Sequence, residues 1–228
     1  MSAPALGTRA TGTGAPRWRL ARFLRATVGK LLLAAYRTRI IGEECVPAEG
    51  GYILAGNHVS YLDPCLLWCH ERRPTHFIAR EDLFELPVIG WALPRLWAFP
   101  IKRGAADREA IQRATELLKL GEPVGIFPEG TRQRPGESGE LELGEAHAGV
   151  AFIAMHANVP VVPVGIAGTE KALPRGAKLP RFPRVTVRYG VPVCPDEFTE
   201  GGRKERTAAM TAEIMRRIGE ARTLAEKG

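Results

Sequence analysis

Two short runs in this chain are apolar at every position, and they restrict its possible folds more than any other feature. They are VGIF at 124–127 and VVPVGI at 161–166. A strand with one face in water alternates polar and apolar side chains, whereas a strand buried on both faces is apolar throughout. A sheet that is covered on both faces needs helices on each side, so these runs favour an α/β fold.

Strand-like runs alternate with helical patterns along the body of the chain. We expect helices where apolar residues recur at helical spacing, at 61–72, 105–120, 145–156 and 202–225. We expect strands at 51–56, 76–80, 97–102, 123–128, 160–166 and 184–190. The 228 residues are enough for one sizeable domain. The pattern therefore predicts a single sheet flanked by helices, in one domain over residues 41–228.

The charge of the chain is unevenly distributed. Its 32 Lys and Arg outnumber its 25 Asp and Glu. Eight of the basic residues and none of the acidic ones lie in residues 1–42, so the other 24 basic and 25 acidic residues nearly balance. A basic arm suits an anionic surface, either phospholipid or nucleic acid. Because the sequence has no pattern of a known nucleic-acid-binding module, we expect a membrane surface as the partner and no nucleic acid.

The basic arm divides into a tail and a helix. Residues 1–16 are rich in Gly, Ala and Thr, and they predict a disordered tail without the apolar core of a signal peptide. Residues 17–40 predict a basic amphipathic helix in the membrane interface, with Trp18, Arg22 and Arg25 at the headgroups. A helix packed on the protein's own body fits the same pattern. Each arginine would cost about 2.5–3.5 kcal/mol at a bilayer centre, so we expect a peripheral and not a spanning helix.

The four cysteines are expected to be buried, reduced thiols of a cytosolic protein. They form no CxxC pair, and neither Cys65 nor Cys69 has metal-ligand spacing to a pair of histidines. The sequence also has no P-loop and no GxGxxG fingerprint. It therefore predicts no metal and no cofactor.

The segment GNHVSYLDP, residues 56–64, follows a predicted strand and holds a histidine and an aspartate five positions apart. Positions five apart on an ideal helix differ by about 140°, so His58 and Asp63 meet only if His58 precedes the helix. Either Ser60 caps that helix in a capping box with Asp63, or Asp63 caps it with Pro64 as the first helical residue. A carboxylate behind a neutral imidazole makes a base for an alcohol proton. A purely structural pair has the same sequence.

A second segment, VGIFPEGTRQR at 124–134, is an apolar strand followed by a turn. Gly130 allows the backbone to approach a ligand closely. Thr131 offers a hydroxyl, and Arg132 offers a planar fork for a phosphate or a carboxylate. A plain turn with a solvated pair of Glu and Arg is equally compatible with the segment.

Both segments resemble signatures of the glycerolipid acyltransferase family, N-H-x(4)-D in NHVSYLD and F-P-E-G-T-R in FPEGTR. The order and the separation of the two motifs also fit that family. Two further segments resemble its second and fourth blocks, AREDLFELPVIGWALPRLWAFPIKR at 79–103 and VPVVPVGI at 159–166. The resemblance covers about residues 40–195, and the best-known bacterial members of the family are 1-acyl-glycerol-3-phosphate acyltransferases.

The resemblance implies a mixed sheet of the glycerol-phosphate acyltransferase type and a direct acyl transfer. The acyl group would pass from acyl-CoA or acyl-carrier protein to the hydroxyl of 1-acyl-glycerol 3-phosphate, giving phosphatidic acid in phospholipid biosynthesis. His58 would be the general base, and Asp63 would orient it. The acceptor's glycerol phosphate would be bound by five residues of the second and third blocks, Arg103, Glu129, Gly130, Thr131 and Arg132. The expected location is the cytoplasmic face of the plasma membrane, as a peripheral protein.

Three positions depart from the family pattern. Ala98 stands where glycine is usual, Lys102 precedes Arg103 where an acidic residue is frequent, and His147 stands near the place of a lysine found in many relatives. If that lysine helps to hold phosphate, His147 leaves the class of the acceptor open. The same transfer to a different lysophospholipid or lipid alcohol therefore stays open. A non-catalytic peripheral lipid-binding protein, with the basic arm as its working part, also stays open.

Overall fold

The computed structural model describes residues 23–101, 108–130, 148–172 and 181–228 of the chain. Within them, seven strands form one sheet in the order β1-β7-β6-β2-β5-β3-β4. All neighbouring strands are parallel except β6 and β7, which are antiparallel. The predicted single mixed sheet is therefore confirmed. The strands are β1 Arg39–Ile41, β2 Ile53–Gly56, β3 His76–Arg80, β4 Phe99–Ile101, β5 Val124–Ile126, β6 Val161–Ala167 and β7 Thr186–Tyr189.

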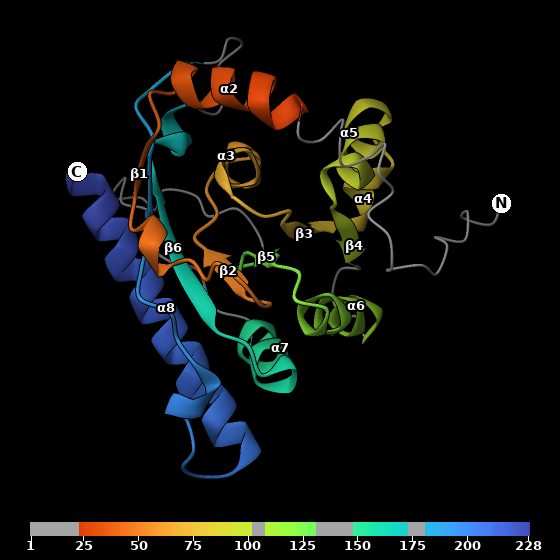
Figure 1. The fold of residues 1–228 in the computed structure, drawn as a ribbon, viewed down its shortest axis with the longest axis vertical. Helices are drawn as coiled ribbons and strands as arrows, with labels where there is room; N and C mark the ends of the chain where they lie inside the picture. The colour runs from red at the N-terminus through yellow and green to blue at the C-terminus, as the bar shows by residue number, and fades with distance from the viewer. Residues whose placement is uncertain (1–22, 102–107, 131–147, 173–180) are drawn as a thin grey trace, which may run out of the picture.

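Helices cover both faces of the sheet (Figure 1). The four predicted helices are α3 Leu62–His70, α6 Arg108–Lys119, α7 Gly149–Ala157 and α8 Arg203–Lys227. Two short helices, α4 Glu81–Phe84 and α5 Pro87–Ala92, lie between β3 and β4 and were not predicted. A π-helical turn, η1 Arg25–Gly29, runs into α2 Lys30–Ala35 near the start of the described chain. The remaining short helical turns are η2 Glu43–Cys45, η3 Leu93–Leu96, η4 Thr169–Lys171 and η5 Pro195–Glu197.

Successive residues of the central strands feed two separate cores, which explains why these strands are apolar throughout. Ile53 of β2 packs with α6, α7 and α8, whereas its neighbour Leu54 packs with α3 on the opposite face. Val161 and Val162 of β6 divide between the same two cores. All four are at most 1% exposed. The result is a three-layer arrangement of helix, sheet and helix.

The long helix α8 lies directly against β6 (Figure 1), and a glycine makes this close approach possible. A Cβ atom at Gly165 would lie 2.2 Å from the carbonyl carbon of Ala221 and 2.2 Å from the amide nitrogen of Arg222. Any side chain at this position would push the helix away from the strand. Helix α8 begins where Glu205 accepts the backbone N–H of Gly202 at 2.8 Å, which completes its first turn.

The predicted helix over residues 17–40 is too long, because the helix ends at Ala35. Arg37 then adopts a left-handed conformation with φ 44°, and the N–H of Thr38 donates to the carbonyl of Leu33 at 2.8 Å. Residues 39–41 form the edge strand β1 instead, paired with β7. The tail, Trp18 and Arg22 lie outside the described residues. Among the described residues, no helix has the length and apolar character of a membrane span.

Candidate active site

His58 and Asp63 meet at the end of β2, in the geometry that the spacing requires. His58 lies in the loop between β2 and α3, and Asp63 lies in the first turn of α3. The imidazole Nδ1 is 2.9 Å from Oδ2 of Asp63. The aspartate side chain is fully buried, while the histidine side chain keeps 17% of its surface exposed. Because a carboxylate accepts the Nδ1 proton, Nε2 of the neutral imidazole carries a lone pair for an incoming proton.

The carboxylate of Asp63 also organises the loop before the helix. Its Oδ2 accepts the backbone N–H groups of Val59 at 2.8 Å and of Ser60 at 2.7 Å. The Ser60 hydroxyl in turn accepts the N–H of Leu62 at 3.3 Å. Tyr61 is the N-cap of α3 and makes no side-chain capping bond, so neither predicted cap is observed. The contact of Asp63 with the Ser60 N–H is one half of the predicted capping box. The loop and the side chain therefore fix each other.

The second motif lies beside the first because β5 pairs directly with β2. The ring of Phe127, just after β5, stacks on the imidazole of His58 with centroids 4.3 Å apart and planes at 23°. Oε2 of Glu129 accepts the backbone N–H of His58 at 3.3 Å. Gly130 turns the chain with φ 62°, a conformation that favours glycine. Phe127 and Glu129 thus hold the histidine from the neighbouring strand.

Only two of the five predicted acceptor-binding residues lie in the described part of the chain. Glu129 contacts the backbone of His58 and is 4% exposed, and Gly130 follows it directly in the chain. Arg103, Thr131, Arg132 and the atypical His147 lie outside the described residues. The contact of Glu129 with the His58 backbone gives this side chain a structural task whether or not it also binds an acceptor.

Strand β6 supports the site from the other side of β2, and no local sequence pattern indicates this contact. The side-chain amide of Asn57 donates to the carbonyl of Ile166 at 3.0 Å and accepts its N–H at 2.7 Å. The hydroxyl of Thr169 donates to Oδ1 of Asp63 at 2.7 Å. Asn57 and Thr169 are each 1% exposed. These contacts span 109 and 106 residues, and only an expectation that β6 adjoins β2 would have found them.

The thiol closest to the site is unsuited to nucleophilic catalysis. Burial, with smaller contributions from Cys69 and Asp63, raises the pKa of Cys65 to about 11. The thiol therefore stays protonated at neutral pH, whereas a nucleophilic cysteine needs a lowered pKa. All four cysteines are free. Within the described ranges, no group of three or more His, Cys, Asp or Glu side chains is arranged to hold a metal ion.

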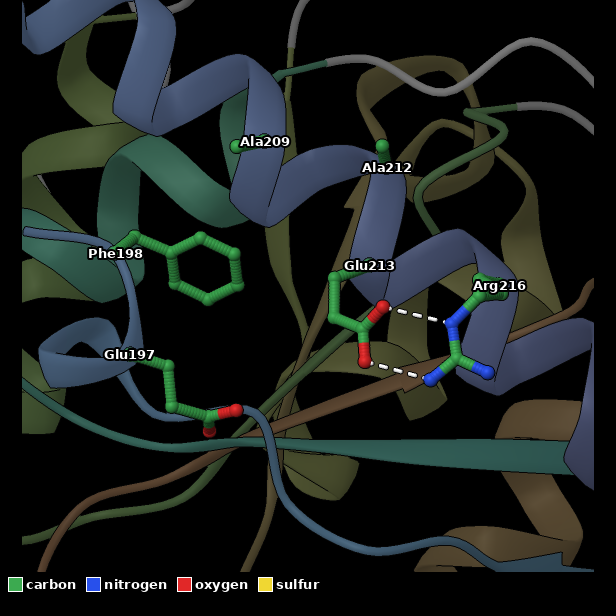
Figure 2. A pocket seen from close by; sticks show the side chains of 6 residues that line it. All are labelled: Glu197, Phe198, Ala209, Ala212, Glu213 and Arg216. Atoms are coloured by element: carbon green, nitrogen blue, oxygen red, sulfur yellow. Dashed lines mark hydrogen bonds and ion pairs between the residues drawn. The ribbon is translucent and has the colours of Figure 1, made fainter. Parts of the chain in front are cut away.

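A cavity of about 360 Å³ lies away from both motifs, between η5 and α8 (Figure 2). It is lined by Glu197, Phe198, Ala209, Ala212, Glu213 and Arg216. The guanidinium of Arg216 pairs with the carboxylate of Glu213 at 2.7 Å across its rim. Glu197 pairs with Arg217 at 3.1 Å, outside the lining. The charged groups of the cavity thus already have partners, and the cavity has no part in the candidate site.

Comparison with known proteins decides the family. The model of the Acyltransferase family matches residues 37–167. The chain is 31% identical over 183 residues to the 1-acyl-sn-glycerol-3-phosphate acyltransferase of Bacillus subtilis, covering 80% of this chain and 86% of the relative. The chain belongs to the acyltransferase family. The predicted resemblance is thereby confirmed.

Two further relatives of this acyltransferase support the same family assignment. It is 36% identical over 146 residues to the chloroplastic 1-acyl-sn-glycerol-3-phosphate acyltransferase BAT2 of Brassica napus. That match covers 63% of this chain and 41% of the plant protein, so the chain spans less than half of the relative's length. The crystal structure of the 1-acyl-sn-glycerophosphate acyltransferase of Thermotoga maritima matches with a TM-score of 0.67 and 25% identity. This match covers 90% of this chain and 82% of the other.

Proposed function

We propose that this acyltransferase moves an acyl group from acyl-CoA or acyl-carrier protein to the free hydroxyl of 1-acyl-glycerol 3-phosphate, giving phosphatidic acid for phospholipid biosynthesis. The observation that carries the proposal is the contact between His58 Nδ1 and the buried carboxylate of Asp63 at the end of β2. The relatives from Bacillus, Brassica and Thermotoga are all named for transfer to 1-acyl-sn-glycerol 3-phosphate or its glycerophosphate equivalent. Those names support the choice of acceptor.

In the proposed mechanism, Nε2 of His58 takes the proton of the acceptor hydroxyl as its oxygen attacks the thioester carbonyl. The new bond is the ester C–O bond, and the bond that breaks is the thioester C–S bond. The proton held by His58 then passes to the leaving thiolate, so the enzyme returns to its starting state. Asp63 stabilises the imidazolium between these two steps. Proton transfer by a placed base contributes roughly 10²–10⁴ in rate.

Binding of the acceptor's phosphate requires hydrogen-bond donors near His58, from cationic side chains and from backbone N–H groups. We assign this task to Arg103 and Arg132, with Gly130 and Thr131 of the second motif and Glu129 as further contacts. The support is that Glu129 accepts the backbone N–H of His58 and that Gly130, the next residue, turns the chain there. Lys102 and His147 make the acceptor class the part of the proposal that most needs an experiment.

We also propose that the N-terminal helix lies on the cytoplasmic face of the plasma membrane and that the protein is peripheral. Three large apolar side chains of η1 and α2 and of the residues before them are exposed, Phe23 at 63%, Val28 at 57% and Leu31 at 71%. Trp18 and Arg22 would add headgroup contacts. Arg25 is a weaker candidate, because its guanidinium carbon lies 5.6 Å from the ring centre of Trp68 on the protein's own body.

The experiment is the release of free thiol from oleoyl-CoA or oleoyl-carrier protein with 1-acyl-glycerol 3-phosphate in detergent micelles. We expect acceptor-dependent release by the wild type, a loss of at least about 10²-fold in His58→Ala, and near wild-type release by Cys65→Ala. A panel of lysophospholipids and lipid alcohols, repeated with Arg103→Ala, should show a loss selective for phosphate acceptors. Equal release by the wild type and His58→Ala would refute the mechanism, and a loss in Cys65→Ala would indicate an acyl-enzyme.

A further inference from the structure

The carboxylate of Asp63 is held on both of its oxygens, and the two oxygens have different partners. Oδ2 faces His58 Nδ1 and two backbone N–H groups from the same loop. Oδ1 accepts the hydroxyl of Thr169 at 2.7 Å. Thr169 is 1% exposed and Asp63 is fully buried, so water does not compete for this contact.

We propose that Thr169 is a positioning residue of the His58–Asp63 pair, an inference that rests on the proposed base mechanism. A carboxylate can rotate about its Cβ–Cγ bond, and such rotation would carry Oδ2 away from the imidazole. The three donors on Oδ2 come from one short loop, whereas the hydroxyl on Oδ1 comes from a different element. The fourth hydrogen bond therefore fixes the carboxylate from the opposite side. Thr169 acts on the reaction only through Asp63.

The chain around Thr169 is rigid enough for this task. Thr169 opens η4, directly after β6, and the N–H of Ala172 donates to its carbonyl at 3.1 Å. Gly168 adopts φ 99°, and a Cβ there would lie 2.3 Å from the carbonyl oxygen of Arg184. The Gly168 N–H donates to the Glu170 carboxylate at 2.8 Å. The Thr169 hydroxyl thus belongs to a turn that has its own internal hydrogen bonds and packs against Arg184, just before β7.

The test compares Thr169→Val, Thr169→Ser and Thr169→Ala in the full-length protein. Valine keeps the shape and removes the hydroxyl, serine keeps the hydroxyl, and alanine also removes the hydroxyl and replaces valine in the test if valine folds poorly. We expect kcat to fall about tenfold in the valine and alanine variants, as loss of a hydrogen bond to a charged group implies, with KM for the acceptor unchanged. Serine should restore kcat. Thr115→Val, a buried threonine whose hydroxyl bonds within α6, should have no effect on kcat.

A second readout does not depend on turnover. The Nδ1–H resonance of His58, observed by NMR, should show a weakened hydrogen bond to Asp63 in Thr169→Val and the wild-type hydrogen bond in Thr169→Ser. The inference is overturned if valine leaves both kcat and this resonance unchanged, or if serine is as impaired as valine. A wild type whose activity survives His58→Ala would instead overturn the proposed function, and the Nδ1–H resonance would still decide the role of Thr169.

Discussion

Asn57 offers the sharpest test of how the site is held in place. Its side-chain amide makes two hydrogen bonds to the backbone of Ile166, at 3.0 and 2.7 Å, and Asn57 is 1% exposed. In Asn57→Ala, both the N–H and the carbonyl of Ile166 lose this partner inside the protein. A buried polar group without a partner costs about 1–3 kcal/mol, so the two together should cost about 2–6 kcal/mol. That is a large part of a typical free energy of unfolding of about 5–15 kcal/mol.

The assay is urea unfolding at pH 7, followed by circular dichroism, with the thiol-release assay run in parallel. In Asn57→Ala we expect a clearly lower urea midpoint of unfolding. We also expect a loss of activity, because His58 directly follows residue 57, which is no longer tied to Ile166. Thr115→Val is the matched control. Its hydroxyl bonds to the carbonyl of Ile111 in the same helix, and that carbonyl keeps its helical N–H partner. A loss of less than about 1 kcal/mol in Asn57→Ala would refute the reasoning, since it would mean that the two buried bonds carry no penalty.

Two further substitutions test the core and its buried charge. Burial raises the pKa of Glu71 above its ordinary value of 4.5, although the hydroxyls of Tyr189 and Tyr52 donate to it at 2.5 and 3.0 Å. The folded state therefore binds this proton more tightly than the unfolded state, and Glu71 makes stability fall as pH rises above about 4.5. Urea unfolding across pH 4–8 should show that the free energy of unfolding falls less with rising pH in Glu71→Gln than in the wild type. An identical pH dependence in the two proteins would contradict this argument. In the same assay, Gly165→Ala should lower the free energy of unfolding by about 1–3 kcal/mol, because the new Cβ overpacks against α8. Gly149→Ala has no atom within 4 Å of the new Cβ, so this variant should be as stable as the wild type or more stable. Equal effects of the two substitutions would contradict the packing argument.

The elements that could be predicted are those whose signal lies within a few residues. The apolar run from Val161 to Ile166 predicts strand β6, and a long helical pattern predicts α8; the structure contains both. The contact between His58 and Asp63 follows from a spacing of five residues and the helix start at Leu62, and it is confirmed. The local sequence is sufficient to predict a contact when the two residues that make it are close together in the chain.

The features that could not be predicted depend on partners far along the chain. Strand β1 has only three residues and begins with Arg39, and it is a strand because Thr186 and its neighbours in β7 pair with it. Thr169 looks like an ordinary residue after a strand, and its contact with Asp63 exists only because β6 lies beside β2. A single sequence does not reveal the order of strands in a sheet, so it does not reveal the contacts that this order creates.

The position of β6 also has a consequence for the newly made protein. Translation completes both His58 and Asp63 about a hundred residues before Ile166 and Thr169, the partners that hold them. A nascent chain that ends before β6 carries His58 and Asp63 without the strand that holds them in place. Enzyme activity on the ribosome, or in a prematurely terminated fragment, is therefore expected only after β6 and Thr169 have been synthesised and β6 has paired with β2. The strand order thus delays completion of the candidate site until after both of its motifs have been synthesised.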